Sequence, residues 1–311
     1  GKGIMGITME CAQCHSHKYD PFSQKEYYEL FAFFINSKEK GFEGDVSQSK
    51  PAKTPILWVE QDDLEGILSF INHQDTTKLR VSVMGELDES EKRTTYILDR
   101  GVYDAPTIPV EPSTPTSILE FDQAYEKNRL GLTKWATSRE NQLTSRVLVN
   151  QIWQEIFGKG IVKSAGDFGM QGDLPTHPEL LDWLADDFME NGWDIKRLLK
   201  QILMSSTYRQ SAEINKKHLE IDPDNLYLSR SSRLRLPAEN IQDQGDKLYR
   251  RGIYNFIKLT VPPPKAIIFD SSNRDRCKIS RNLTNTPLQA LVKMNDPKDL
   301  EAARVLSTKL T

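Results

Sequence analysis

The residues best suited to chemistry lie close together near the start of the sequence. Cys11, Cys14 and His15 form a C-x-x-C-H motif, although the chain contains only 3 Cys and 5 His. This spacing is the attachment pattern of a c-type haem. On one helical turn the two thiols reach the two vinyl groups of the porphyrin, and the adjacent imidazole ligates the iron. The motif therefore predicts a haem c cofactor bound by these three residues.

The same segment also allows a different metal site. His17 and Asp20 follow the motif closely. Together with Cys11, Cys14 and His15 they would supply enough N, O and S ligands for zinc or another divalent metal. A redox disulfide and a pair of structural thiols are two further interpretations of the cysteines. We favour haem over zinc, and zinc over the other two.

Three more side chains could serve as further ligands. His177, Met170 and Cys277 carry the imidazole, thioether and thiol groups that an iron or another metal would accept. Each also has an ordinary structural interpretation. His177 would be a hydrogen-bonding residue in the first turn of a helix, Met170 would pack in a core, and Cys277 would be an inert thiol.

The overall composition is that of an ordinary globular protein. Of 311 residues, 38% are hydrophobic and 27% are charged, and the formal net charge is −3. This balance lacks the basic excess that a nucleic-acid backbone requires, so we expect no nucleic-acid partner. No apolar run approaches the roughly 18 residues of a membrane span. The length is enough for two domains that each bury a core.

Most of the sequence has helical periodicity, interrupted by a region with β signals. A capping box at Ser23–Glu26 predicts the start of a helix. Alternation of apolar and polar residues predicts strands over 79–87 and 94–98, and the prolines from Pro106 to Pro115 predict an extended connector. The first helix carries a stripe that we expect to line a core or a haem crevice: Tyr27, Leu30, Phe31 and Phe34.

Caps and periodicity predict further helices. They cover 64–71, 144–157 with Gly158 as the stop, the helix after the capping box Thr176–Glu179, the helix capped by Asp194, and two starts at 286–287 and 296–297. We therefore expect a mainly α protein, in which a helical domain is accompanied by a small β-rich insert, α+β overall.

Three stretches resemble a known family: CAQCHSHKYDPFSQKEYYELFAFF, the run from NQLTSRVLVNQIW to LLKQILMSSTYRQS, and NLTNTPLQALVKMNDP. They resemble the PSCyt-type proteins, large planctomycete-type secreted proteins that join a cytochrome-c-like module to paired domains of unknown function. The resemblance implies that 1–45 is the C-terminal part of a helical domain bearing C-x-x-C-H. It implies that 116–311 is a mainly helical domain of unknown function. The strand signals and the prolines predict that 46–115, between the two, is a small β-rich insert with its Pro-rich connector.

The resemblance also implies a location and a role. It implies export to the periplasm or cell surface, an upstream cytochrome-like module in the full-length protein, and electron transfer linked to polysaccharide breakdown. A glycan or a redox partner would then be the binding partner. The alternatives are a glycan-binding or hydrolytic module with a non-haem metal, and a structural scaffold. Family members carry several tens of residues more between Gln244 and Gly245. Because the chain opens at Gly1 without Met, we expect any export signal to lie outside it.

Overall fold

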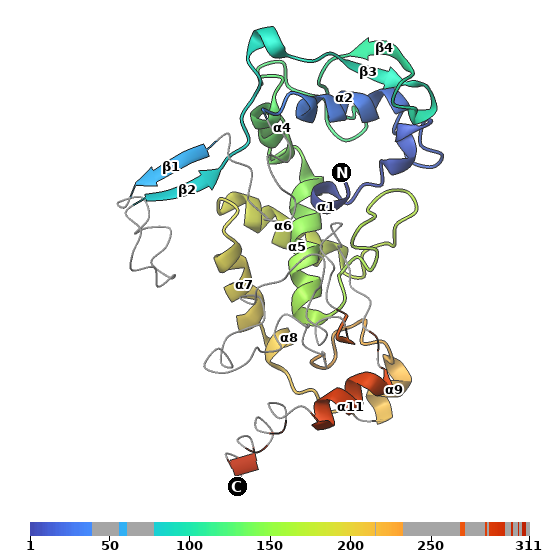
Figure 1. Ribbon diagram of the computed structural model, residues 1–311. Coiled ribbons are helices and arrows are strands. Elements are labelled where there is room, and N and C mark those ends of the chain that lie inside the picture. The colour runs from blue at the N-terminus through green and yellow to red at the C-terminus, as the bar shows by residue number, and fades with distance from the viewer. Residues whose placement is uncertain are drawn as a thin grey trace. The chain divides into compact units, whose positions relative to one another are not determined.

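The computed structural model is mainly helical and carries two small antiparallel sheets in the part that it describes (Figure 1). This confirms the predicted fold class. The chain forms two compact units: unit 1 combines Gly1–Thr8 with Gln142–Thr311, and unit 2 is Met9–Asn141. The three-part division of the sequence stays a prediction. The described residues are 1–38, 56–60, 78–214, 216–232, 268–270, 284, 286–295, 300, 304 and 307–308.

Helix α2 (Gln24–Ile35) is the central element of unit 2, and it begins at the predicted capping box. The Ser23 hydroxyl accepts a hydrogen bond from the Glu26 amide at 3.2 Å, and the Ser23 amide donates to the Glu26 carboxylate at 2.8 Å. Each side chain thus satisfies a backbone amide of the first turn that has no partner within the helix.

The face that α2 buries differs from the predicted one. Tyr28, Ala32 and Phe33 are buried, whereas Phe31 is 45% and Phe34 is 47% exposed. Phe33 packs against Phe121, with 5.4 Å between ring centroids. The prediction that the stripe faces the core is therefore wrong. The side of α2 that the rest of unit 2 covers is the neighbouring one, which carries Tyr28, Ala32 and Phe33.

Replacing Ser23 with alanine is expected to lower the free energy of unfolding by about 1 kcal/mol, the usual cost of losing an N-cap side chain. Burial alone would raise the pKa of Glu26, but hydrogen bonds from Ser23 and Thr116 outweigh it and hold that pKa below its ordinary value. The stabilisation from Glu26 is therefore complete above its unfolded-state pKa and is lost as the pH falls through the lowered value.

Urea unfolding followed by circular dichroism, repeated from neutral to acidic pH, measures both effects. Ser90→Ala is the matched control, because Ser90 is exposed and lies in the short 3-10 turn η3 (Glu89–Glu91). Equal unfolding midpoints for Ser23→Ala and Ser90→Ala would show that the cap contributes nothing.

Two strand pairs accompany α2 in unit 2. Strands β3 (Thr95–Leu98) and β4 (Pro106–Val110) pair antiparallel, with Tyr96 opposite Pro109, and are joined through the 3-10 turn η4 (Asp99–Gly101). The strand predicted over 94–98 and the extended Pro-rich segment are confirmed. Proline is tolerated in β4 because a two-stranded sheet consists of edge strands.

The other pair confirms part of a second predicted strand. β1 (Ile56–Glu60) and β2 (Lys78–Ser82) pair antiparallel. The strand predicted over 79–87 stops at Ser82, and beyond it Glu86 makes an isolated bridge to Ser37. The predicted helix over 64–71 lies outside the described residues. Helix α4 (Arg129–Ala136) completes the regular structure described in this unit.

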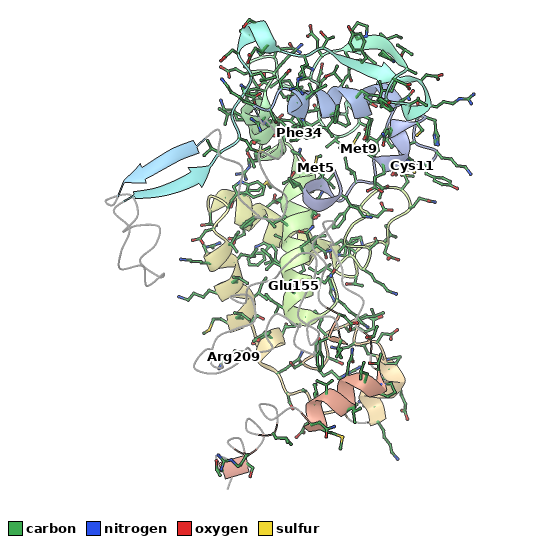
Figure 2. All side chains as sticks on the ribbon, viewed as in Figure 1. Met5, Met9, Cys11, Phe34, Glu155 and Arg209 are labelled. Carbon is green, nitrogen blue, oxygen red and sulfur yellow. The ribbon has the colours of Figure 1, made fainter. Side chains whose placement is uncertain are left out.

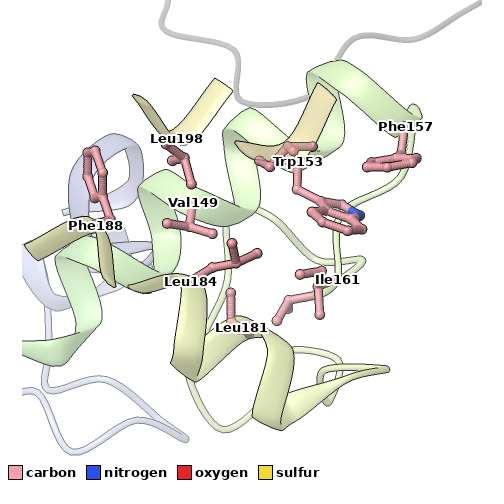
Figure 3. Packing of buried hydrophobic residues seen from close by; sticks show 10 residues of the cluster. Val149, Trp153, Phe157, Ile161, Leu181, Leu184, Phe188 and Leu198 are labelled. Atoms are coloured by element: carbon pink, nitrogen blue, oxygen red, sulfur yellow. The ribbon is translucent and has the colours of Figure 1, made fainter. Parts of the chain in front are cut away.

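The core of unit 1 lies between three helices: α5 (Gln142–Phe157), α6 (Pro178–Glu190) and α7 (Ile195–Met204). Figure 3 shows side chains of all three pointing toward one another. Each large apolar side chain buried there contributes about 1.5–3 kcal/mol relative to exposure. The cluster consists of Val149, Trp153, Phe157, Ile161, Val162, Leu181, Leu184, Phe188, Leu198 and Ile202.

The helix ends of unit 1 test the predicted caps. Gly158 follows α5 at φ 80°, and the Asp194 side chain accepts a hydrogen bond from the Arg197 amide at 3.0 Å; both predictions are confirmed. The Thr176 cap is wrong: its hydroxyl donates to the Ile161 carbonyl, so α6 starts after His177 without a side-chain cap. Two short helices follow, α8 (Ser206–Arg209) and α9 (Lys216–Ile221). Helix α11 (Pro287–Asn295) begins at the start predicted over 286–287. The start predicted over 296–297 lies outside the described residues.

The segment Gly1–Thr8 belongs to unit 1 through helix α1 (Lys2–Met5), which packs on α5 (Figure 1). Gly6 has φ 60°, its carbonyl accepts from the Phe168 amide at 2.7 Å, and a Cβ there would lie 2.8 Å from the Phe168 ring. The Gln151 side chain donates to the Gly3 carbonyl at 3.1 Å. Among the described residues no helix is long and apolar enough to cross a bilayer.

Candidate functional site

The C-x-x-C-H motif lies on a single 3-10 turn in unit 2, η1 (Glu10–Gln13), with Cys14 as its C-terminal cap. Cys11 and Cys14 are free thiols, and both residues are exposed. Figure 2 marks Cys11 on this turn, which follows Met9. His15 is exposed as well. The three predicted haem-attachment residues are thus all exposed and lie within five residues of one another, on the turn and just after it.

Helix α2 and strand β3 hold this turn in place through the carbonyl of Gln13. That carbonyl accepts a hydrogen bond from the Tyr28 hydroxyl at 3.0 Å and another from the Gln24 side-chain amide at 3.1 Å. The same Gln24 amide donates to the Leu98 carbonyl at 3.0 Å. Ala12, between the cysteines, is fully buried. The backbone of the motif is therefore fixed while its cysteine side chains stay accessible.

Gly101 leaves the space that the Cys14 thiol occupies. The residue has φ 75°, and a Cβ built on it would lie 2.9 Å from the Cys14 sulfur and 3.4 Å from the Gln13 carbonyl oxygen. Arg100 before it also has a positive φ, 49°. The turn η4 thus brings bare backbone against the thiol, which only glycine permits without strain.

His15 and His17 are held in opposite tautomers. The Nδ1 atom of His15 lies 2.8 Å from the carbonyl oxygen of Ser16, so it carries the proton and donates. Its Nε2 atom therefore has a free lone pair. A metal-ligating histidine typically donates its other ring N–H in this way to a carbonyl or carboxylate. His15 thus engages Nδ1 with the backbone, and the neutral ring carries its lone pair on Nε2.

His17 and Asp20 instead form a closed local turn. The Nδ1 atom of His17 accepts a hydrogen bond from the Asp20 amide at 2.9 Å, which places the ring proton on Nε2. The Asp20 carboxylate lies 3.5 Å from the same Nδ1 atom, and the two side chains are only 8% and 2% exposed. The His17 amide donates to the Phe22 carbonyl at 2.7 Å. These contacts give both residues a structural role in shaping the loop.

Aromatic side chains continue along α2 beyond the residues that hold the motif. Burial raises the pKa of Tyr27, and negative charge at Cys14 and Glu10 raises it further. Tyr27 packs edge-on against Tyr28 at 5.1 Å between ring centroids. Phe31 and Phe34, one and two turns further along α2, are about half exposed. The stripe excluded from the core thus leaves apolar rings exposed on the helix whose Gln24 and Tyr28 hold the Gln13 carbonyl.

The remaining predicted ligands are distributed elsewhere. Met170 (77% exposed) and His177 lie in unit 1, where the His177 ring contacts the Thr176 hydroxyl at 2.9 Å. Cys277 lies outside the described residues. Within the described part of the chain, no group of three or more His, Cys, Asp and Glu side chains is arranged to hold a metal ion. The ligand assignments at Cys11, Cys14, His15, His17 and Asp20 stay predictions.

The sequence patterns do not point to the residues that support the motif. Gly101 is far from Cys14 in the sequence, and its approach to Cys14 depends on how the β3–β4 hairpin packs on α2. Gln24 and Tyr28 fall within the helix predicted to start at Ser23–Glu26. Their position one turn apart on α2 is the signal that would have placed both donors on one face.

The chain was also compared with known proteins. The family model of PSD1, a protein of unknown function (DUF1553), matches residues 128–245 and 242–311. The family model of PSCyt2, also a protein of unknown function (DUF1549), matches residues 1–39. The first match is in two segments, which overlap at residues 242–245. No curated protein and no solved structure matches the chain.

Proposed function

The chain belongs to the PSD1 family, and its C-x-x-C-H turn lies in the segment that matches the PSCyt2 family model; we propose that this turn attaches a c-type haem for electron transfer. The single observation that carries the proposal is the tautomer of His15: its Nδ1–H donates to the Ser16 carbonyl and leaves Nε2 available as an axial ligand. The same turn presents the free thiols of Cys11 and Cys14.

Both thiols suit covalent attachment. Each thiol would add its sulfur and its hydrogen across one vinyl group, so a C–S bond forms, a C=C bond becomes a single bond, and no oxidant is consumed. Gly101 keeps the Cys14 sulfur free of a neighbouring side chain. Haem bound here supplies one-electron redox chemistry. The half-exposed rings of Phe31 and Phe34 offer apolar surface to a flat hydrophobic group.

The donor set supports haem over a mononuclear metal. Haem attachment needs only Cys11, Cys14 and His15 from this segment. A four-coordinate zinc site needs at least one more ligand, and the local candidates are engaged in the turn: the His17 Nδ1 accepts from the Asp20 amide, and the Asp20 carboxylate is buried against it. The zinc alternative is therefore retained as an outcome of the experiment.

We also infer where the protein works. Covalent haem attachment in bacteria takes place outside the cytoplasm, so the protein would act in the periplasm or at the cell surface. Its electrons would pass to or from a redox partner, for which the upstream cytochrome-like module is the first candidate. The connection to polysaccharide breakdown is supported by the family resemblance alone.

The experiment is a pyridine haemochrome spectrum with metal analysis on the same sample, using the chain exported in a host that matures c-type cytochromes. We expect one c-type haem per chain in the wild type and none in Cys11→Ser/Cys14→Ser. In His15→Ala we expect an altered absorption spectrum of the native protein, recorded before pyridine replaces the axial ligands. His17→Gln is the matched control, with haem content unchanged.

A colourless wild-type protein would refute the haem proposal. If that protein carries one equivalent of zinc, and His17→Gln or Asp20→Asn loses it, the mononuclear metal site replaces haem as the function of this segment. Far-ultraviolet circular dichroism of each variant separates loss of a ligand from loss of the fold.

A further inference from the structure

A pocket of about 520 Å³ lies within unit 1, far along the sequence from the C-x-x-C-H motif. It is formed by three stretches, 153–163, 173–177 and 223–232, together with Ile214 and carries none of the residues used in the haem proposal. This volume is in the range of sites for small organic molecules. The predicted ligand His177 is part of its wall.

The end of α5 supplies a rigid apolar base. Trp153 and Phe157 stack with 4.3 Å between ring centroids, and they are 6% and 5% exposed. In Figure 3 the indole nitrogen of Trp153 is turned away from Val149 and Leu184. Within the described part of the chain, this indole N–H donates to no other residue. The nitrogen is not among the described side-chain atoms that are buried without a partner, so it is reachable from the pocket, and a ligand acceptor there would gain a hydrogen bond.

The lining also contains a buried cation. Arg230 is 9% exposed, and its guanidinium donates to the carbonyls of Asp222 and Pro223 at 2.8 and 2.7 Å. The buried Asp222 carboxylate accepts from the amides of Leu226 and Tyr227, and within the described part of the chain no carboxylate pairs directly with Arg230. A buried cation without a directly paired carboxylate favours an anion beside it.

The other charged groups of the lining are two lysines and two carboxylates. Lys159 donates to the backbone carbonyl of Asp224 at 3.1 Å, and Lys163 makes no ion pair with any described residue. Lys159, Lys163, Asp173 and Asp224 are all exposed, so water screens all four and their charges offset one another. The buried Arg230 is therefore the charge of the lining that water screens least, and it is positive.

We propose that this pocket binds a small organic oxyanion, a carboxylate or a phosphate or sulfate ester with a compact apolar body. The oxyanion accepts from the Trp153 indole and is attracted by Arg230 and Lys163. The apolar body contacts the aliphatic part of the lining, which includes Ile161, Leu226 and Leu228. This site is independent of the haem proposal and can be tested on protein without any cofactor.

The experiment follows the indole N–H resonances of the 5 Trp residues by NMR in the full 311-residue chain. The Trp153 resonance is the one missing from Trp153→Phe. Phenyl phosphate and benzoate are expected to shift it saturably, and phenol, their neutral counterpart, is not. Lys163→Met is expected to raise the dissociation constant at least fivefold. Lys196→Met, an exposed lysine of α7, is the matched control and leaves it unchanged.

Inorganic phosphate distinguishes two sources of the same chemistry. If it binds as tightly as phenyl phosphate, the ligand is a free oxyanion and the apolar body contributes nothing, which overturns that part of the proposal. If it binds at least tenfold more weakly, the organic ester is supported. An unmoved Trp153 resonance, an equal response to phenol, or equal affinity in Lys163→Met and Lys196→Met overturns the site itself.

Discussion

Replacing Asn150 with leucine is expected to lower the free energy of unfolding of unit 1 by about 3 kcal/mol. Asn150 is fully buried in α5, and its side-chain amide pairs with both backbone groups of Val162: it donates to the carbonyl at 3.0 Å and accepts from the amide at 2.8 Å. Leucine has a similar volume but leaves both groups buried and unsatisfied, at about 1–3 kcal/mol each.

The measurement is urea unfolding monitored by circular dichroism, with Glu155→Leu as the control. Glu155 is exposed on the same helix (Figure 2), and glutamate and leucine have similar helix propensities, so the control should change stability by less than about 0.5 kcal/mol. If Asn150→Leu unfolded at the same urea concentration as Glu155→Leu, the two hydrogen bonds between Asn150 and Val162 would contribute nothing to the free energy of unfolding.

Replacing Gly101 with alanine is expected to prevent most haem attachment and to destabilise unit 2. The positive φ alone costs about 1–2 kcal/mol for a residue with a Cβ. In addition, the new Cβ would lie 2.9 Å from the Cys14 sulfur, so the thiol must move from its place against η4. We expect the haem-bearing fraction in the haemochrome assay to fall severalfold.

Gly192→Ala is the matched control for this variant. Gly192 has φ 69°, and a Cβ there would meet nothing within 4 Å. It therefore introduces the same backbone strain without any collision. If both variants attach haem equally well, Gly101 does not position the thiol. If Gly101→Ala destabilises no more than Gly192→Ala but still loses haem, the effect is specific to Cys14.

Local signals in the sequence located helix ends more reliably than helix faces. The caps at Ser23 and Asp194 depend on a side chain reaching an amide three residues away, and both form. The Thr176 cap fails because a distant carbonyl, that of Ile161, competes for its hydroxyl. Periodicity alone could not decide which side of α2 faces the core, since that depends on where Phe121 packs.

The candidate site was predictable in its residue types and unpredictable in its geometry. The sequence identifies Cys11, Cys14 and His15 by spacing. It does not show that His15 donates to a carbonyl while His17 accepts from an amide, because that depends on the path of the backbone around Asp20. The oxyanion pocket had no sequence signal, because its walls come from stretches separated by up to several tens of residues.

The placement of Gly1–Thr8 in unit 1 affects both the order in which the two units fold and the way in which they are inherited. Unit 1 includes residues before the C-x-x-C-H segment and resumes at Gln142. Unit 2 is therefore inserted in the sequence of unit 1. On the ribosome, α1 must wait for α5 and Phe168 to emerge before it can dock, by which time unit 2 is complete. Recombination at the edge of either family match would separate α1 from α5, on which it packs. We therefore expect the two units to be inherited together, as parts of one chain.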